Sequence, residues 1–286
     1  MSILLPPTAV ESTDHGFDAL LGPARSRYLG DGHRRVALHV SDPEQIDEGT
    51  VASSASISYP NDWSTKAGQE RSPHLSTVDA LRIAGSVMKS PLVAAGMASR
   101  YTLERSLTVR AGARPWEDLA HVPVTTRIRE DTDCSALHVH HTIGSLRVES
   151  EWVHSAARPV VADRWEAGAA TEIQLTAGAL VRCRYERRSA PHEMISFLEA
   201  MMLTAQMSQV ALYRGDAERR DRSGNMWMRR AGFVRDVHQW RRAAPVEVEL
   251  LNQRELLVRD QTIRTAEVLA RDVFGVQVTA SLATGS

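Results

Sequence analysis

The sequence predicts an α+β fold made of two copies of one structural unit, and two observations lead to this prediction. A short phrase at the start of a helix occurs twice, and the strand-like segments around each copy follow the same order. Self-similarity at a fixed offset usually marks a repeated structural unit. A chain of 286 residues is long enough for two units, because single domains usually contain roughly 100–200 residues.

The repeated phrase reads "SPHLSTVDALRIAG" at 72–85 and "APHEMISFLEAMMLTAQ" at 190–206. When the serines are aligned, Asp79 corresponds to Glu199, an offset of 199 − 79 = 120 residues. A Pro-His pair precedes each copy, and the second copy has two more residues between its histidine and its acid. The phrase predicts a helix in each half of the chain.

Segments rich in β-branched residues with partial alternation predict strands around both helices. In the first half they lie at 33–41, 51–59, 101–112, 122–130, 135–143 and 145–154. In the second half they lie at 171–187, 225–234, 245–252, 254–264 and 273–282. Each half therefore consists of strands, one apolar helix and about four further strands.

A helix that is apolar nearly all the way round must be buried, and a curved antiparallel sheet can wrap it. One such unit is a hot dog, so the chain is predicted to be a double hot dog, its sheets joined edge to edge or face to face by a pseudo-twofold axis. The small, proline-containing stretch 155–170 is the expected linker, which gives an N-terminal unit with an extension, 1–155, and a C-terminal unit, 156–286. An α+β protein without the repeat is the alternative.

Composition excludes several classes of function. The formal charge is −1 from 34 basic and 35 acidic residues, so no overall field favours nucleic acid or an anionic membrane. The longest apolar runs, such as 194–205, are shorter than the roughly 20 residues of a membrane span. The first residues lack the basic region of a secretory signal, and Cys134 and Cys183 have no CxxC spacing. We expect a cytoplasmic protein with reduced thiols.

The two helix acids are the leading catalytic candidates. Apolar neighbours on several faces of its helix would keep Glu199 out of water, which raises the pKa of a carboxyl and suits it to proton transfer. The alternative is a capping box, Ser196-x-x-Glu199, although Pro191 would start that helix earlier. Ser76-x-x-Asp79 has the same capping-box spacing, so a structural role is the alternative for Asp79 as well. Because an acid occurs at the equivalent place in both copies, a catalytic role is favoured.

His74 and His192 precede the two helices and are the other catalytic candidates. Each histidine would reach an acid within its own half or across the pseudo-dimer, His74 to Glu199 or His192 to Asp79. The alternative is a partly exposed loop residue bonded to backbone.

Other polar groups lie in patterns that suggest binding sites. His138 and His140 share one face of a predicted strand, but no carboxylate or cysteine joins them at ligand spacing, so they are expected on the sheet surface rather than at a metal. The charged stretch 213–230 is expected to be mostly solvated, yet Arg229 and Arg230 beside Trp227 could hold a phosphate or a phosphopantetheine arm. The sequence contains no P-loop, GxGxxG, GxSxG or HExxH motif, and we expect no cofactor and no metal.

Two resemblances narrow the chemistry. The stretch "FLEAMMLTAQ" at 197–206 resembles the central helix of the β-hydroxyacyl carrier-protein dehydratases, in which the helix acid and a histidine of the neighbouring hot dog remove water from an acyl thioester. The glycine-rich loop of that family is not reproduced ahead of Glu199. A longer likeness, "LLGPARSRYLGDGHRRV" at 20–36 and "YPNDWSTKAGQERSPHLSTVDALRIA" at 59–84, resembles the avirulence D family.

The second resemblance implies a biosynthetic enzyme that joins a β-ketoacyl chain to a sugar in forming lactone signals, the syringolides. The A-factor type synthases, which are also double hot dogs, carry out a similar reaction. They transfer a β-ketoacyl group from a carrier thioester to a triose phosphate. We therefore expect an enzyme that takes an acyl chain from a carrier protein or coenzyme A and transfers it to a polyol.

In this hypothesis Glu199 or Asp79 accepts a proton, His74 orients or donates, and amides at a helix start bind the oxyanion. The alternatives are dehydration of a β-hydroxyacyl thioester and non-catalytic binding of an acyl chain or lactone. No nucleic acid or membrane is expected as a partner, and a homodimer remains open.

Overall fold

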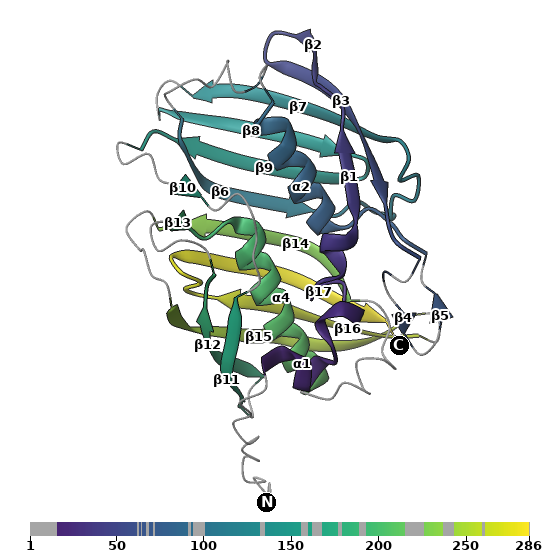
Figure 1. Cartoon of the computed structure of the whole chain (residues 1–286), viewed down its shortest axis with the longest axis vertical. Helices are drawn as coiled ribbons and strands as arrows, with labels where there is room; N and C mark the ends of the chain where they lie inside the picture. Colours follow the sequence, from purple (N-terminus) through teal and green to yellow (C-terminus); the bar gives the residue numbers. More distant parts are fainter. Residues whose placement is uncertain are drawn as a thin grey trace, which may run out of the picture.

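The chain forms one large antiparallel sheet with two main helices against one face (Figure 1). The computed structural model describes residues 16–61, 63, 65–66, 69–70, 72–90, 93, 101–131, 135–155, 160–161, 168–176, 179–188, 193–214, 226–236, 243–258 and 261–285. The large sheet with few helices agrees with the α+β prediction.

The first half of the sheet contains seven of its strands. They are β1 (Ala37–Val40), β2 (Glu44–Asp47), β3 (Thr50–Ser58), β6 (Leu103–Arg110), β7 (Val122–Asp131), β8 (Ala136–Ile143) and β9 (Leu146–Val153). Helix α2 (Thr77–Met88) lies between β3 and β6 in the chain. The short pair β4 (Thr65–Lys66) and β5 (Gln69–Glu70) forms a separate ribbon before the helix.

The second half of the sheet contains the other six strands. They are β11 (Ala169–Leu175), β12 (Leu180–Glu186), β14 (Met226–Arg235), β15 (Ala243–Val258), β16 (Gln261–Ala270) and β17 (Val276–Gly285). Helix α4 (Phe197–Tyr213) lies between β12 and β14. Strands β10 (Val160–Val161) and β13 (Glu193–Met194) form a short parallel pair outside the sheet.

The two halves have the same order in the sheet. Apart from β2, which pairs with β3, the 13-stranded sheet runs β1-β3-β7-β8-β9-β6-β14-β17-β16-β15-β12-β11. From the centre outward, the first half runs β6, β9, β8, β7, β3, β1 and the second half runs β14, β17, β16, β15, β12, β11. If β2 is left out and the strands of each half are numbered along the chain, both halves have the order third, sixth, fifth, fourth, second, first. The helix follows the second strand in both halves, so the repeated order predicted from the sequence is present.

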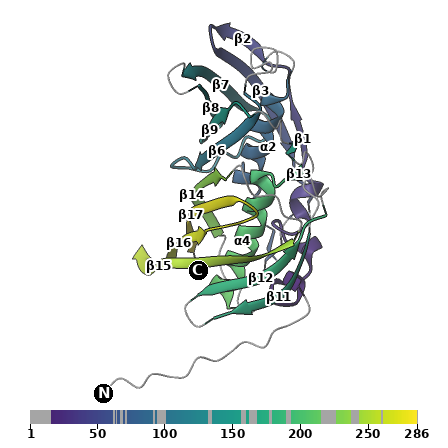
Figure 2. The same cartoon turned by 90° about the vertical axis from the view of Figure 1, so that its left-hand side faces the viewer.

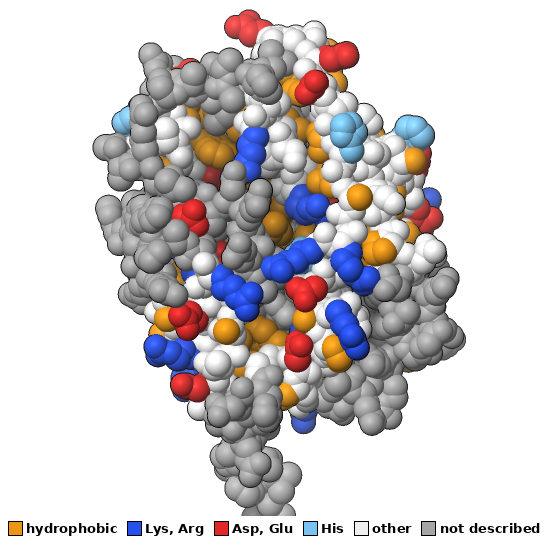
Figure 3. All heavy atoms as spheres, in the orientation of Figure 1, with side chains coloured by type: hydrophobic (Ala, Val, Ile, Leu, Met, Phe, Trp, Pro, Cys, Tyr) orange, Lys and Arg blue, Asp and Glu red, His pale blue; other side chains and the backbone are white. Residues whose placement is uncertain are grey.

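The halves meet edge to edge at the antiparallel pair β6 and β14, one of the two arrangements expected. Leu107 lies opposite Phe233 and Val109 lies opposite Ala231, and all four side chains are buried. Figure 2 shows the continuous sheet curving, with α2 and α4 on its inner side. Figure 3 shows basic side chains gathered near the middle of that face, at the level where the halves meet.

The two helices differ in how completely they are enclosed. Nearly all of α4 is buried against β12, β15 and β17, as expected for a helix apolar on most sides. Helix α2 buries one face against β1, β8 and β9, while Gly85 and Ser86 on its other side are exposed. The N-terminal segment, with α1 (Gly16–Leu21) and the 3₁₀ turns Ala24–Ser26 and Gly32–Arg35, packs beside α4 and brings Tyr28 toward α2.

Two local predictions were wrong. Residues 254–258 do not begin a new strand but continue β15 after a bulge between Leu251 and Arg254, so the predicted segment 254–264 is divided between β15 and β16. Helix α4 starts at Phe197 with Ser196 as its N-cap, not near Pro191, because residues 193–194 pair as a strand. Cys183 is free and buried, and Cys134 lies outside the described residues. Within the described ranges, each helix is too short or too polar to span a bilayer.

Candidate functional site

A cavity of about 490 Å³ lies between the start of α2 and the inner side of α4. One wall consists of Tyr28, Tyr59 and the residues 74–78 that lead into α2. The opposite wall is a stripe of α4, Met201, Ala205 and Gln209, which share a helix face because they are four residues apart. Both halves of the chain therefore build this cavity.

The rim of the cavity comes from the ends of the two central strands. Residues 111–115 follow β6, and residues 226–229 open β14. Gly112 is needed at this rim, because a Cβ there would clash with the carbonyl oxygen of Ser145 in the β8–β9 turn. The join between the halves thus sets the entrance.

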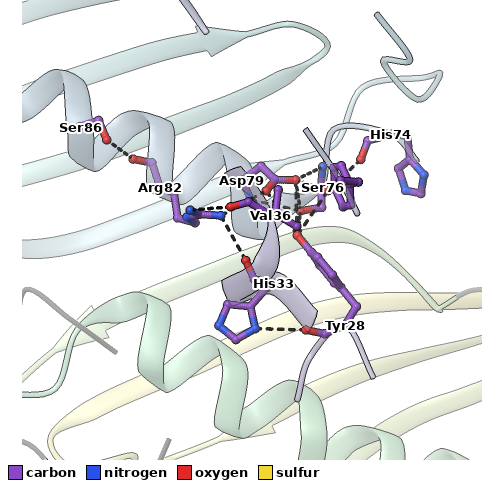
Figure 4. Close-up of polar contacts among 9 residues, drawn as sticks. Tyr28, His33, Val36, His74, Ser76, Asp79, Arg82 and Ser86 are labelled. Atoms are coloured by element: carbon purple, nitrogen blue, oxygen red, sulfur yellow. Dashed lines mark hydrogen bonds and ion pairs between the residues drawn. The ribbon is translucent and has the colours of Figure 1, made fainter. Parts of the chain in front are cut away.

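Asp79, the acid of the first repeat, lies at the start of α2 with its side chain among those of Tyr28, Ser76 and Arg82 (Figure 4). Its side chain is 0% exposed, and its Oδ2 atom accepts hydrogen bonds from the Tyr59 hydroxyl, from Ser76 Oγ at 2.6 Å and from the Ser76 amide at 3.1 Å. The Tyr28 hydroxyl lies 2.6 Å from Ser76 Oγ and 3.4 Å from both carboxylate oxygens. Asp79 does not itself line the cavity, whereas all three hydroxyl-bearing residues do.

The local sequence explains how the carboxylate is held. Ser76 and Asp79 form a complete capping box, in which Ser76 Oγ accepts from the Asp79 amide at 3.1 Å and the Asp79 carboxylate accepts from the Ser76 amide. The capping alternative is therefore present in the structure. Capping alone does not require two tyrosines, so the cap and the hydroxyl cluster are separate features of the same acid.

Burial and the nearby Asp79 charge raise the pKa of Tyr28 and of Tyr59 well above the usual value of a phenol. Both tyrosines are therefore neutral hydrogen-bond donors near pH 7. Arg82, one helical turn after Asp79, lies 3.9 Å from the carboxylate and donates to the carbonyl oxygens of His33 and Val36. Burial, aided by Arg34 and Arg82, lowers the pKa of His33 to about 4, so its ring is neutral.

Glu199, the acid of the second repeat, has different surroundings. It is 1% exposed, and its two carboxylate oxygens each lie 3.4 Å from a nitrogen of the buried Arg187 guanidinium. Burial raises the pKa of Glu199, and Arg187 opposes that shift. Ser196 caps the helix by accepting from the Glu199 amide at 3.0 Å. Neither Glu199 nor Arg187 lines the cavity.

The other predicted residues lie at or beyond the rim. The ring of His74 stacks on Trp227 of β14, with centroids 4.7 Å apart, so it links the two halves at the entrance and contacts neither helix acid with its ring. Arg229 occupies the bulge of β14 and lines the cavity, and Arg230 lies on the solvent face of the same strand. His192 and most of 213–230, namely 215–225, lie outside the described residues.

Sequence reasoning missed Tyr28, Tyr59 and Gln209. Gln209 is 9% exposed, and its Oε1 atom is buried without a hydrogen-bond partner in the described part of the chain. An unpaired buried oxygen is costly, and the residue that carries this one lines the cavity. The sequence did contain a clue to the two tyrosines. Tyr28 lies in the stretch 20–36 and Tyr59 in the stretch 59–84, which carry the longer family resemblance.

The described residues contain no cluster of three or more histidine, cysteine or acidic side chains that would hold a metal ion. His138 and His140 lie on β8, each 4.0 Å from a different carboxylate, Asp131 and Glu149. The cavity brings together residues whose hydroxyls contact a buried carboxylate, Thr77 and Val78 at the start of α2, and Gln209 of α4.

Comparisons with known proteins give one family match. The model described as Pseudomonas avirulence D protein (AvrD) matches residues 12–170 and 156–285. The search of curated proteins found no match.

Solved structures of low identity were also found. A tesB protein of Mycobacterium avium subs paratuberculosis is 13% identical with a TM-score of 0.45, covering 90% of this chain and 99% of that one. A hot-dog-fold protein of unknown function from Alicyclobacillus acidocaldarius is 12% identical with a TM-score of 0.43, covering 90% and 97%. The dehydratase domain of PpsC from Mycobacterium tuberculosis is 10% identical with a TM-score of 0.37, covering 74% and 84%.

Proposed function

Since the chain belongs to the avirulence D family, whose model matches 12–170 and 156–285, we propose that it is an acyl-thioester enzyme that transfers a β-ketoacyl group to a hydroxyl of a polyol. The acyl donor is a carrier-protein or coenzyme A thioester. We interpret the two halves, 1–155 and 156–286, as two hot dogs joined at β6 and β14. The working site is the cavity at the start of α2.

One observation carries the proposal: Tyr28, Tyr59 and Ser76 line the cavity, and the hydroxyls of all three approach the buried carboxylate of Asp79. A carboxylate is a general base, and hydroxyls that bond to it are able to pass protons between it and a ligand. Because Asp79 is fully covered, its exchange with a substrate has to pass through these groups. Tyr59 is the most direct route, since its phenol donates straight to Oδ2.

The transfer then proceeds in two proton movements. The acceptor hydroxyl gives its proton to the phenol oxygen of Tyr59 as the proton of Tyr59 passes to Asp79, and the acceptor oxygen attacks the thioester carbon. The carbonyl oxygen becomes an oxyanion, and the C–S bond then breaks. Asp79 returns the proton through Tyr59 to the leaving thiolate, so the products are an ester and a thiol. The raised pKa of Tyr59 fits a phenol that remains neutral at both ends of this exchange.

The oxyanion would be met by the start of α2. Thr77 and Val78 are its first two residues, and both line the cavity. The first amides of a helix have no intrahelical acceptor and carry the positive end of the helix dipole. Donors of this kind, directed at developing negative charge, give large catalytic effects.

The rest of the cavity fits the two substrates. Met201, Met226 and Met228 supply flexible apolar surface suited to an acyl chain. On the same side, Gln209 lines the cavity, and a rotation of its side chain would bring Oε1 to a hydroxyl of the polyol. His74 and Trp227 lie at the rim, where the thioester enters.

Dehydration of a β-hydroxyacyl thioester is the rival reaction. The helix that resembles the dehydratases carries Glu199, which is paired with Arg187 away from the cavity, so transfer is favoured. The test is to incubate the protein with β-ketoacyl and β-hydroxyacyl carrier thioesters in separate tubes, with triose phosphate or xylulose, and to follow product masses. An ester formed only from the ketoacyl substrate is expected.

Asp79→Asn is the control variant, and it should form product at least about a hundredfold more slowly. Loss of water from the hydroxyacyl thioester alone would reject the transferase. Ligand binding without any turnover across chain lengths, unchanged in Asp79→Asn, would favour a non-catalytic binder of acyl chains or lactones.

A further inference from the structure

Three arginines lie side by side on the solvent face of the sheet where the two halves join. Arg147 of β9 is directly opposite Arg110 of β6, and Arg110 is directly opposite Arg230 of β14. Residues directly opposite in antiparallel strands point to the same face. Their chain neighbours Val148, Val109 and Ala231 are buried on the helix side, so the arginines face solvent, and all three are exposed. We call Arg110, Arg147 and Arg230 the arginine ladder.

The ladder has no acidic partner in the described residues, although like charges directly opposite are unfavourable. The acids nearest in register are engaged elsewhere: Glu149 lies 4.0 Å from His140, and Glu267 accepts from Asn252 at 2.7 Å. Arg182, an arginine on this face of β12, is by contrast paired with Glu247 at 2.8 Å. With a formal charge of −1 for the whole chain, the ladder is a local concentration of positive charge.

The ladder adjoins the entrance of the cavity. Arg110 is the last residue of β6 and leads into the rim residues 111–115, and Arg230 follows Arg229 in the bulge of β14. Arg114 and Arg229 are both exposed and line the cavity. Positive side chains therefore run from the open sheet face to the opening through which a substrate must pass.

We propose that the arginine ladder is the docking surface for an acidic acyl carrier protein, which presents its thioester to the cavity; this rests on the proposed function. Small molecules bind in concave sites, whereas the ladder lies on an open sheet face spanning three strands, roughly 10 Å at the usual strand spacing. Protein interfaces are enriched in arginine, and opposite charges steer partners together. An acidic protein surface fits the ladder better than the phosphates of coenzyme A.

The test compares the double variant Arg110→Glu with Arg147→Glu against the wild type. Three acyl donors are used: a β-ketoacyl carrier protein, the matching coenzyme A thioester and a short N-acetylcysteamine thioester. The variant should bind the carrier protein at least tenfold more weakly and raise its KM by a similar factor, with turnover of the short thioester unchanged. Wild-type binding should weaken with added salt much more steeply than binding by the variant. Arg184→Glu, an exposed arginine on the same face of β12, is the matched control and should behave as the wild type.

Unchanged affinity of the variant for the carrier protein would overturn the docking surface, as would an equal rise in KM for coenzyme A, which would assign the ladder to phosphates. Loss of short-thioester turnover in the variant would also count against it. A wild type that binds the carrier protein through the ladder yet turns over none of the three thioesters would refute the proposed function while leaving the docking surface standing.

Discussion

The starts of α2 and α4 are equivalent positions of the repeat, and they hold the same kind of acid in two different ways. Both helices have a serine N-cap whose Oγ accepts from the amide of an acid three residues later. In α2 the carboxylate of Asp79 is surrounded by hydroxyls that line a cavity. In α4 the carboxylate of Glu199 faces the guanidinium of Arg187, away from that cavity.

This difference shows that burial of an acid does not by itself make it a catalyst. Both carboxylates are almost fully inaccessible, so the distinction lies in their partners. A neighbouring cation compensates the charge of Glu199, which is a structural solution. Hydroxyls stabilise the charge of Asp79 and also give it a route to a ligand. The repeat thus supplies one scaffold twice, and the residues around each acid decide its role.

The largest expected effect is on turnover at the α2 start. Asp79→Asn keeps a side chain able to complete the cap but removes the base, so kcat should fall by about 10²–10⁴. Tyr59→Phe should lower kcat by a smaller factor, because Tyr28 and Ser76 still approach the carboxylate. Thioester turnover followed by mass, with circular dichroism to confirm folding, measures both. Glu199→Gln, the equivalent change in the other copy, should leave kcat of the folded protein unchanged; a comparable loss there would erase the distinction.

The next effect is on stability at the α4 start. Glu199→Ala leaves the guanidinium of Arg187 buried without its carboxylate, which should cost about 3–5 kcal/mol of unfolding free energy. Replacing both, as Glu199→Leu with Arg187→Met, should recover most of that loss because no charge remains buried. Urea denaturation of the wild type and the two variants measures this. If the double variant is as unstable as the single one, the ion pair is not what holds this helix start.

Much of the fold was predictable from the sequence because it depends on local pattern. The repeated phrase, alternating strands and apolar α4 gave the element order and the equivalence of the halves. The division between β15 and β16 was not predictable, since apolar Leu256 and Leu257 look like the start of a strand while β15 in fact continues to Val258 and β16 begins at Gln261. The edge-to-edge join was one of two expectations, and only the pairing of β6 with β14 decided between them.

The site was predictable only in part. Asp79 and Glu199 were found by their repetition, but nothing local distinguishes them, because their partners come from distant segments. Tyr28 and Tyr59 lie 51 and 20 residues before Asp79, and Arg187 lies 12 residues before Glu199. A buried acid requires partners, and which residues supply them is settled by tertiary structure. His74 was predicted to pair with an acid in its own half or with Glu199 across the halves, whereas its ring stacks on Trp227.

A smaller effect is expected on acceptor binding at the α4 wall. Gln209→Leu removes the unpaired Oε1 atom, so a polyol hydroxyl would lose its acceptor and KM for the polyol should rise about tenfold, in line with about 1–2 kcal/mol for one hydrogen bond. The KM for the acyl thioester should stay constant. Steady-state kinetics with each substrate varied in turn separates the two constants. Gln206→Leu is an unsuitable control because Gln206 bonds Arg27, so Met201→Leu, an apolar change on the same stripe, serves instead.

The smallest expected effect is a pH dependence of the unfolding free energy, caused by His33. This residue lies next to α2, where Arg82 donates to its carbonyl oxygen. Its folded pKa of about 4 lies below the usual 6.5, so between these values the unfolded chain binds more protons and stability falls as the pH is lowered. At pH 5.5 this should cost about 1 kcal/mol relative to pH 7. His33→Asn, which keeps a group able to bond the Tyr28 carbonyl, should lessen that fall when urea denaturation is repeated at both pH values. An identical fall in the variant would mean that other groups near Asp79, rather than His33, make this half sensitive to acid.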